Sequence, residues 1–197
     1  MRKVILYDCS ESSLSEEERK NVLPPSVLAH CFSYSLKEDR LNSRTAYFLL
    51  LRYRKDNKIP VGNIFFSEHG KPYRKNGIFF SISHSRNRIA VLISSSECGI
   101  DIQEVQNKDF DSRSERVLSS HEHSLYLESK DKPSFFTSCW VRKEAYLKRI
   151  GTGITSLSEL KKIDENLTAS SILDSEGNKY YYAYLNIEKD EHLTSTN

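Results

Sequence analysis

The chain has 197 residues, and its 29 lysine and arginine residues nearly balance 27 aspartate and glutamate residues, so the formal net charge is +2. A charge this small produces no field strong enough for nonspecific binding to nucleic acid, so any anion site must be local. The longest wholly apolar run, Ala46–Leu51, is far shorter than the ~20 residues that span a bilayer. We therefore expect neither a nucleic-acid-binding protein nor a membrane protein.

Apolar content and cysteine spacing indicate a folded protein of a reducing compartment. Hydrophobic residues make up 38% of the chain, and 197 residues suit one large domain or two small domains packed together. The first residues contain no apolar segment of the kind found in signal peptides. Cys9, Cys31, Cys98 and Cys139 are widely spaced and form no CxxC pair. We expect four free, mostly buried thiols and a cytoplasmic protein.

The N-terminal part of the chain has a mostly helical pattern. Ser15–Glu18 resembles a capping box, and Pro24-Pro25 interrupts the pattern before a second helix. Leu36–Arg54 is the longest helical candidate, combines apolar with basic residues, and is followed by Asp56-Asn57 as its end.

From Ile59 the pattern changes to short segments separated by turn residues. Ile78–His84 alternates in side-chain character, Ile89–Ser94 returns after a turn, and Gly99–Val105 follows a second turn. Three short strands with tight connections predict an antiparallel meander.

The C-terminal part repeats the order of helices and then strands. Phe110–Lys130 is charged and helical, and Pro133–Ile150 is a further helix that ends at a glycine. Ser170–Leu173 and Lys179–Ile187 predict a hairpin. Helices followed by strands, twice over, predict an α+β chain with two intimately packed halves.

One predicted strand, Gly99–Gln103, carries an acid between two isoleucines. Side chains alternate along a strand, so Ile100 and Ile102 face one side while Asp101 and Gln103 project from the other, about 6.6 Å apart. An acid in this position is either part of a site, an ordinary residue of a solvated sheet face, or the partner of a lysine. The strand alone leaves these alternatives open.

The helix over 135–150 places charged residues beside an apolar stripe. Glu144 and Lys148 are four residues apart and therefore adjacent at the edge of this stripe, while Lys143 points toward it. The alternative is a surface ion pair with no function. Gly151-Thr-Gly153 follows directly and permits close approach of backbone to a ligand. The stripe itself consists of Phe136, Cys139, Trp140, Leu147 and Ile150.

Two further segments carry residues that suit phosphate binding, and one resembles a metal motif. Lys71 lies in Gly-Lys-Pro, where it could meet a phosphate, and His84 ends a strand between two serines. A strand-end histidine with a structural role is the alternative for His84. His121 and His123 are two residues apart in a helical pattern, so their rings face apart and we interpret both as surface residues.

Taken together, these segments resemble the Sfp-type 4′-phosphopantetheinyl transferases over residues 70–153. The matching motifs, in order, are Gly-Lys-Pro, Ile-Ser-His-Ser, Gly-Ile-Asp-Ile, Trp-Val-Arg-Lys-Glu-Ala-Tyr-Leu-Lys and Gly-Thr-Gly. The resemblance implies two similar halves, residues 1–97 and 98–197, related by a pseudo-twofold axis. Each half would be a small antiparallel sheet with helices. It also implies transfer of the 4′-phosphopantetheine group of coenzyme A to a serine of an apo carrier protein, with release of 3′,5′-ADP.

By the same resemblance, Asp101 and Glu144 hold Mg²⁺, with Mn²⁺ as the alternative ion. Mg²⁺ prefers oxygen ligands, commonly one or two carboxylates together with substrate phosphates and water. Many members of the family carry a second acid at the position of Gln103, which is neutral but still offers an oxygen ligand. We expect weaker metal binding rather than loss of activity. Glu104 faces the opposite side of the strand and does not replace that acid.

The resemblance also assigns residues to catalysis and to coenzyme A. Attack of a serine oxygen on phosphorus adds charge to the phosphoryl oxygens, and a metal with lysines lowers that barrier. Lys148 would contact the pyrophosphate and support the leaving group, and Glu144 is the candidate base for the serine. Contacts to coenzyme A would come from Lys71, Ser83, His84, Lys143, Lys148 and, for the 3′-phosphate, Arg44 or Arg40.

The partners implied are coenzyme A and an apo acyl or peptidyl carrier protein of fatty-acid, polyketide or non-ribosomal peptide synthesis. The resemblance also suggests a monomer with its site between the halves, because one half supplies His84 and the other Asp101 and Glu144. Two alternatives remain: a non-catalytic relative that binds carrier protein or coenzyme A, and a magnesium-dependent phosphoesterase.

Overall fold

The computed structural model describes residues 1–9, 23–60, 62–68, 70–74, 77–153, 157–163 and 167–186. The predicted capping box at Ser15–Glu18 lies outside these residues. The elements in chain order are β1 (Arg2–Asp8), α2 (Pro25–Phe32), α3 (Lys37–Asp56), β2 (Phe65–Phe66), β3 (Pro72–Tyr73), β4 (Phe79–Ser85), β5 (Arg88–Ser94), β6 (Cys98–Glu104), α4 (Asp111–Val117), α5 (Ser120–Glu128), α6 (Lys132–Ile150), α7 (Leu157–Leu160), β7 (Ser170–Leu173) and β8 (Lys179–Asn186).

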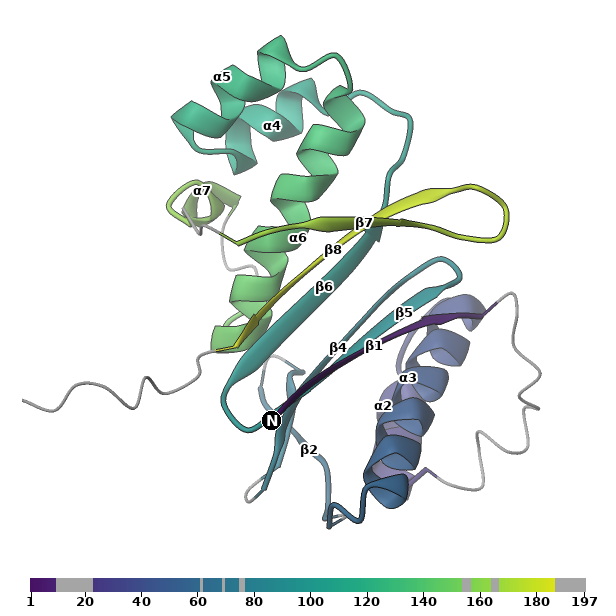
Figure 1. Ribbon diagram of the computed structural model, residues 1–197. Helices are drawn as coiled ribbons and strands as arrows, with labels where there is room; N and C mark the ends of the chain where they lie inside the picture. The colour runs from purple at the N-terminus through teal and green to yellow at the C-terminus, as the bar shows by residue number, and fades with distance from the viewer. Residues whose placement is uncertain are drawn as a thin grey trace, which may run out of the picture.

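The two halves of the chain build three-stranded sheets with the same strand order (Figure 1). The first sheet has the order β1-β5-β4 and the second β6-β8-β7, and all neighbours are antiparallel. In each sheet the strand that comes last in the chain lies in the centre. It pairs with the first strand on one side and with β4 or β7 on the other. The predicted α+β fold with two similar halves, each a small antiparallel sheet with helices, is confirmed.

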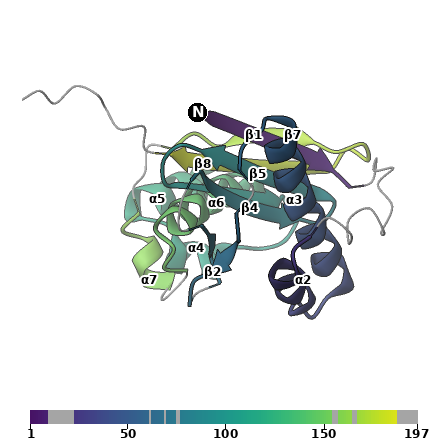
Figure 2. The ribbon, with the colours of Figure 1, turned by 90° about the horizontal axis from the view of Figure 1, so that it is seen from below.

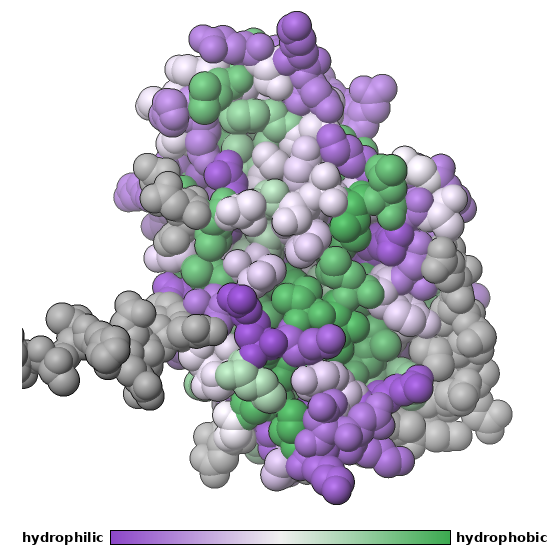
Figure 3. Space-filling view, in the orientation of Figure 1, coloured by the Kyte–Doolittle hydropathy of each residue, from purple (hydrophilic) through white to green (hydrophobic). Residues whose placement is uncertain are grey.

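The core is divided into clusters above, below and between the two sheets. α2 and α3 cover one side of the first sheet through residues such as Leu50, Leu51 and Ile93. A further cluster joins Leu92 of β5 to Ile100 of β6, so the two sheets share buried surface. Strands β1, β7 and β8 lie along one side of the molecule (Figure 2). On that side, apolar side chains gather where the sheets meet (Figure 3).

The predicted meander is wrong in its last strand. β4 and β5 form a hairpin, but β6 pairs with β8 rather than with β5. The reason is that β1, a strand that the sequence analysis did not predict, occupies the second edge of β5. The other expected elements that fall on described residues are present, except that the helical stretch over 110–130 is divided into α4 and α5.

Side-chain hydroxyls join β4 to β6 in place of a backbone ladder. Ser81, Ser83 and Ser85 accept hydrogen bonds from the backbone N–H groups of β6 at 3.1, 3.3 and 3.0 Å. The N–H groups belong to Ile100, Ile102 and Glu104. Every second residue of β4 therefore fixes every second residue of β6. We call this row of hydrogen bonds the serine seam.

Helix α6 is buried along two faces. One face contains Phe136, Cys139 and Leu147, as the sequence predicts, and packs against residues of α4, α5 and α7. A second face, which the sequence analysis did not predict, packs Val141 and Ala145 against β8. Ile150 was assigned to the buried stripe but is 42% exposed, because it lies at the end of the helix. Gly151 ends α6 in a left-handed conformation with φ of 80°.

The cysteines and helices agree with the expectations on thiols and membrane spans. Cys31, Cys98 and Cys139 are buried, Cys9 is half-buried, and none of these four described residues forms a disulfide. In the described ranges, no helix combines the length and apolar character needed to cross a bilayer.

Replacing Gly99 with alanine should destabilise the protein by about 1–3 kcal/mol, because a Cβ at this position would overlap the carbonyl oxygen of Ala145 in α6. This oxygen belongs to the helix backbone, which cannot move aside as a flexible side chain can. Urea denaturation measures the change, and Ser170→Ala on exposed β7 is the control, expected to stay within about 0.5 kcal/mol. A Gly99→Ala variant as stable as the control would contradict this close packing.

Candidate active site

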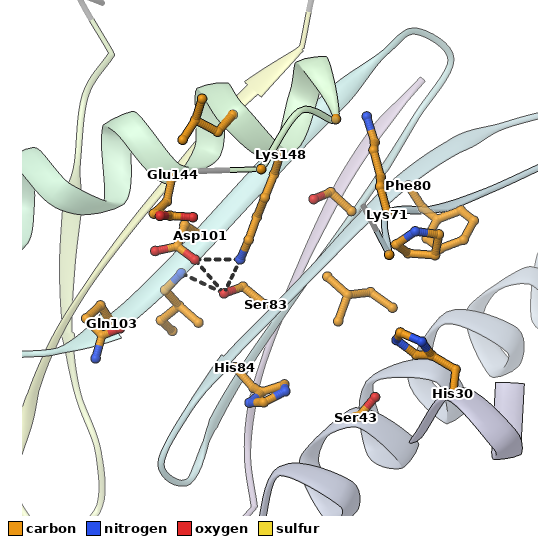
Figure 4. A pocket seen from close by; sticks show the side chains of 18 of the residues that line it. His30, Ser43, Lys71, Phe80, Ser83, His84, Asp101, Gln103, Glu144 and Lys148 are labelled. Carbon is orange, nitrogen blue, oxygen red and sulfur yellow. Dashed lines mark hydrogen bonds and ion pairs between the residues drawn. The ribbon is translucent and has the colours of Figure 1, made fainter. Parts of the chain in front are cut away.

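A cavity of about 460 Å³ lies between the two halves and collects side chains from both (Figure 4). We call it the main pocket. Its lining comes from α2, α3 and β4 of the first half, from β6 and α6 of the second, and from the segments around Lys71 and Gly151. The serine seam lies within it, because Ser81 and Ser83 are lining residues. The pocket therefore depends on how the two halves are joined.

Three polar side chains meet where β4, β6 and α6 come together. The Nζ of Lys148 lies 2.6 Å from Oδ1 of Asp101 and donates to Oγ of Ser83 at 2.8 Å. The Ser83 hydroxyl donates to the same Asp101 oxygen at 2.7 Å. Asp101 is only 5% exposed, so its charge is held by these two partners rather than by water.

Glu144 lies one helical turn before Lys148 and points its carboxylate toward that of Asp101 (Figure 4). Burial and then the negative charge of Asp101 raise the pKa of Glu144 to about 7, although Lys148 opposes the shift. Among the described residues, no hydrogen bond or ion pair of the Glu144 carboxylate is recorded. Two neighbouring carboxylates with one ammonium, which forms its ion pair with Asp101, suit a further cation.

His84 lies at the end of β4 on the other side of Ser83 (Figure 4). Burial lowers the pKa of His84 below its usual value, although Asp39 acts in the opposite direction. The Nδ1 atom is 3.9 Å from the nearer carboxylate oxygen of Asp39, and Tyr34 contacts the ring edge-on. A neutral imidazole held in this way can donate one hydrogen bond into the main pocket.

The structure brings together most of the residues that the sequence analysis selected. Those that line the main pocket are Lys71, Ser83, His84, Asp101, Gln103, Glu144 and Lys148. Lys71 reaches across the halves, because its Nζ donates to the backbone carbonyl of Arg149. Burial lowers the pKa of Lys71.

Lys143 is placed away from the main pocket, which corrects the position expected for a contact to coenzyme A. Its side chain is 1% exposed, and the ammonium forms an ion pair with Glu122 at 2.8 Å. It also donates to the carbonyl oxygens of Leu160 and Ile163 at 2.9 and 2.8 Å. All three donors are used, so Lys143 connects α5 and the segment after α7 to α6. His121 and His123 flank Glu122 and belong to no cluster of metal ligands in the described part of the chain.

The two arginines expected at the 3′-phosphate do not line the main pocket either. Nε of Arg40 donates to the carbonyl oxygen of Tyr34, and Nε of Arg44 donates to that of Arg40. Arg44 is also buried and lies over the ring of Phe32. These contacts hold both guanidinium groups along the helix.

Sequence reasoning missed the aromatic and polar lining contributed by the first two helices. Ser43 and Tyr47 of α3 face the main pocket, together with His30 and Tyr34 at the end of α2. His30 stacks on Phe66 with ring centroids 4.0 Å apart. No local motif marks these residues, because only the packing of α2 and α3 on the first sheet turns them inward.

Comparison with known proteins identifies the family. A sequence model described as the 4′-phosphopantetheinyl transferase superfamily matches residues 97–195, which is half of the chain, and the protein belongs to this superfamily. The family that the motifs resemble is therefore confirmed. The matched half contains Asp101, Glu144 and Lys148.

Individual relatives match the chain over part of their length. It is 35% identical over 119 residues to the 4′-phosphopantetheinyl transferase gsp of Aneurinibacillus migulanus, covering 58% of this chain and 49% of that protein. It is 30% identical over 105 residues to the 4′-phosphopantetheinyl transferase HetI of Nostoc, covering 49% of this chain and 44% of that protein. The chain thus spans about half the length of these curated relatives.

Among solved structures, a chain of the Thermotoga maritima holo-[acyl-carrier-protein] synthase matches with a TM-score of 0.35 and 22% identity. The match covers 47% of this chain and 64% of that chain.

Replacing Glu144 with glutamine should stabilise the protein at about pH 8 and have a smaller effect at about pH 5. The carboxyl ionises near pH 4.5 in the unfolded chain and near pH 7 in the folded protein, so the folded state binds more protons between these values. Stability of the unmodified protein therefore falls as the pH rises through this window. We expect the variant to gain about 1–3 kcal/mol at the higher pH.

Urea denaturation at the two pH values measures this difference. Glu115→Gln makes the same chemical change at an exposed position of α4 and should show no such dependence. A Glu144→Gln effect of equal size at both pH values would contradict the raised pKa.

Proposed function

We propose that the protein transfers the 4′-phosphopantetheine group of coenzyme A to a serine hydroxyl of an apo carrier protein and releases 3′,5′-ADP. The observation that carries this proposal is the convergence of Asp101, Glu144 and Lys148 in a pocket between the two halves. Membership of the superfamily and relatives named as 4′-phosphopantetheinyl transferases support it. The carrier is an acyl or peptidyl carrier protein of fatty-acid, polyketide or non-ribosomal peptide synthesis.

The residues of the main pocket fit a magnesium ion, with manganese as the alternative. Asp101 and Glu144 offer two carboxylates side by side, and burial together with the charge of Asp101 raises the pKa of the half-buried Glu144, which a nearby cation would offset. Gln103 donates its amide N–H to Ser85 at 3.1 Å, so its carbonyl oxygen is the atom left for a metal or its water. A bound Mg²⁺ would neutralise charge on the pyrophosphate of coenzyme A.

The chain's own side chains supply the remaining chemistry. The serine oxygen of the carrier forms a bond to the phosphorus that bears the pantetheine arm, and the bond from that phosphorus to the oxygen of 3′,5′-ADP breaks. Glu144, which faces the reacting centre, accepts the serine proton directly or through a water molecule. Lys148 exchanges its contact with Asp101 for the phosphate oxygens and stabilises the leaving group.

The other lining residues orient coenzyme A. Ser83 and His84 present a hydroxyl and an imidazole toward the phosphates from β4, and Lys71 adds a positive charge at the far side of the main pocket. One chain supplies every one of these groups, which supports action as a monomer. Four cysteines without a disulfide support a location in the cytoplasm.

The decisive experiment incubates the protein with coenzyme A, Mg²⁺ and an apo carrier protein and measures the carrier by mass spectrometry. Transfer adds the phosphopantetheine mass to the carrier. An unmodified carrier that still binds indicates a non-catalytic relative, and hydrolysed coenzyme A without transfer indicates a phosphoesterase. Either of these results would overturn the proposal.

Asp101→Asn and Glu144→Gln should each lower kcat/KM for transfer by at least about 100-fold, because each removes a charge from the reacting centre. Glu104→Gln is the matched control, since this acid of the same strand pairs with Arg86 instead of facing the main pocket. A variant of either site residue with control-level activity would refute the role assigned to that residue.

Gln103→Glu should bind Mg²⁺ severalfold more tightly and retain transfer activity, because it adds a carboxylate beside Asp101. Isothermal titration of Mg²⁺ into the free protein measures the affinity independently of turnover. Gln106→Glu adds the same charge outside the main pocket and should leave the affinity unchanged. Weaker metal binding by Gln103→Glu would place the ion elsewhere.

A further inference from the structure

A buried arginine without a partner lies at the end of α3. Arg54 follows Tyr47, Leu50 and Leu51 on the buried face of the helix and is 0% exposed. In the described ranges of the chain, no hydrogen bond reaches its Nε, Nη1 or Nη2 atoms. The proposed transfer reaction gives this side chain no role.

A second arginine, Arg74, interacts electrostatically with the first. Arg74 follows β3, and its Nε is likewise buried without a hydrogen-bond partner among the described residues. Its guanidinium lies against two glycines, since a Cβ at Gly62 would overlap Nη2 and one at Gly77 would lie 2.9 Å from Nη1. Burial, and then the positive charge of Arg74, lower the pKa of Arg54 to about 10.

Two neighbouring guanidinium groups without an acid are unfavourable unless an anion joins them. Arginine does not escape by losing its proton, because its pKa stays far above neutral. Burial of a charge without a partner costs several kcal/mol, and a like charge nearby adds to this cost. The planar donor fork of arginine matches the oxygens of phosphate, with which it forms paired hydrogen bonds.

The second arginine also gives access to the site. Arg74 lines a cavity of about 380 Å³, here called the second cavity, which adjoins the main pocket. The two cavities share Lys71, Pro72, Phe80 and Gly151 as lining residues. Glu97 is the acid in this lining, and it interacts with Lys71. The charge of Arg74 is therefore not balanced by an acid of the cavity lining.

We propose that Arg54 and Arg74 form an anion site that takes a phosphate group entering from the second cavity. The phosphate comes either from free inorganic phosphate or from the 3′-phosphate of coenzyme A. The second source rests on the proposed function, and two observations make it physically reasonable. Lys71 lines both cavities, and neither Arg40 nor Arg44 lines the main pocket.

Titration calorimetry with inorganic phosphate at constant ionic strength tests the site without any transfer reaction. We expect one phosphate per chain and at least tenfold weaker binding in Arg54→Met and in Arg74→Gln. Arg52→Met is the matched control, because Arg52 lies on the same helix with its side chain 61% exposed. Its affinity for phosphate should equal that of the unmodified protein.

Thermal unfolding provides a second measurement for the buried position. The unfolding midpoint of the unmodified protein should rise with phosphate concentration, and that of Arg54→Met should not respond. Absence of phosphate binding by the unmodified protein, or equal binding by Arg54→Met, would overturn the proposal. Arg54→Lys keeps the charge without the donor fork and should bind phosphate with intermediate affinity.

Competition between phosphate and two nucleotides identifies the source. If the site holds the 3′-phosphate, coenzyme A displaces inorganic phosphate and dephospho-coenzyme A does not. Arg74→Gln then weakens the binding of coenzyme A but not that of dephospho-coenzyme A. If coenzyme A and phosphate bind together, the site exists but takes the free ion. The carrier assay is a separate experiment. If it shows no transfer, the result of the phosphate titration still stands.

Discussion

The serine seam between β4 and β6 is the contact on which the rest of the structure depends. A backbone ladder would bring these strands to about 4.8 Å and make one continuous sheet. Three serine hydroxyls accept the N–H groups of β6 instead, so the two halves remain separate sheets that are fixed in register. Ser83 also belongs to the main pocket, since its hydroxyl contacts Asp101 and Lys148. The joint between the halves is therefore also the floor of the site.

The same geometry explains the electrostatics of the main pocket. Asp101 is buried in the strand next to the seam, and α6 brings Glu144 and Lys148 to it because Gly99 lets the helix backbone approach β6. The single ammonium satisfies Asp101 and leaves Glu144 with a raised pKa. A half-buried carboxylate with a raised pKa, next to a charged pair, is the kind of group found at functional sites.

Cations in this protein divide into those that serve a site and those that hold the fold. Lys143 and Lys148 are five residues apart on α6, yet the first is enclosed by Glu122 and two carbonyl groups while the second faces the main pocket. Arg40 and Arg44 likewise bind backbone carbonyls of their own helix region. Arg54 and Arg74 fit neither group, since no protein acceptor reaches the buried nitrogen atoms in the described part of the chain.

The sequence by itself determined the local features: the hairpins, the ends of α6, the shared face of Asp101 and Gln103, and the adjacency of Glu144 and Lys148. These follow from strand and helix periodicity, which relate residues only a few positions apart. Tertiary structure alone decided the pairing of β6 with β8, the burial of Lys143 and the inward turn of Ser43 and Tyr47. Each of these depends on which distant segment covers a given edge or face, and local spacing carries no information about that partner.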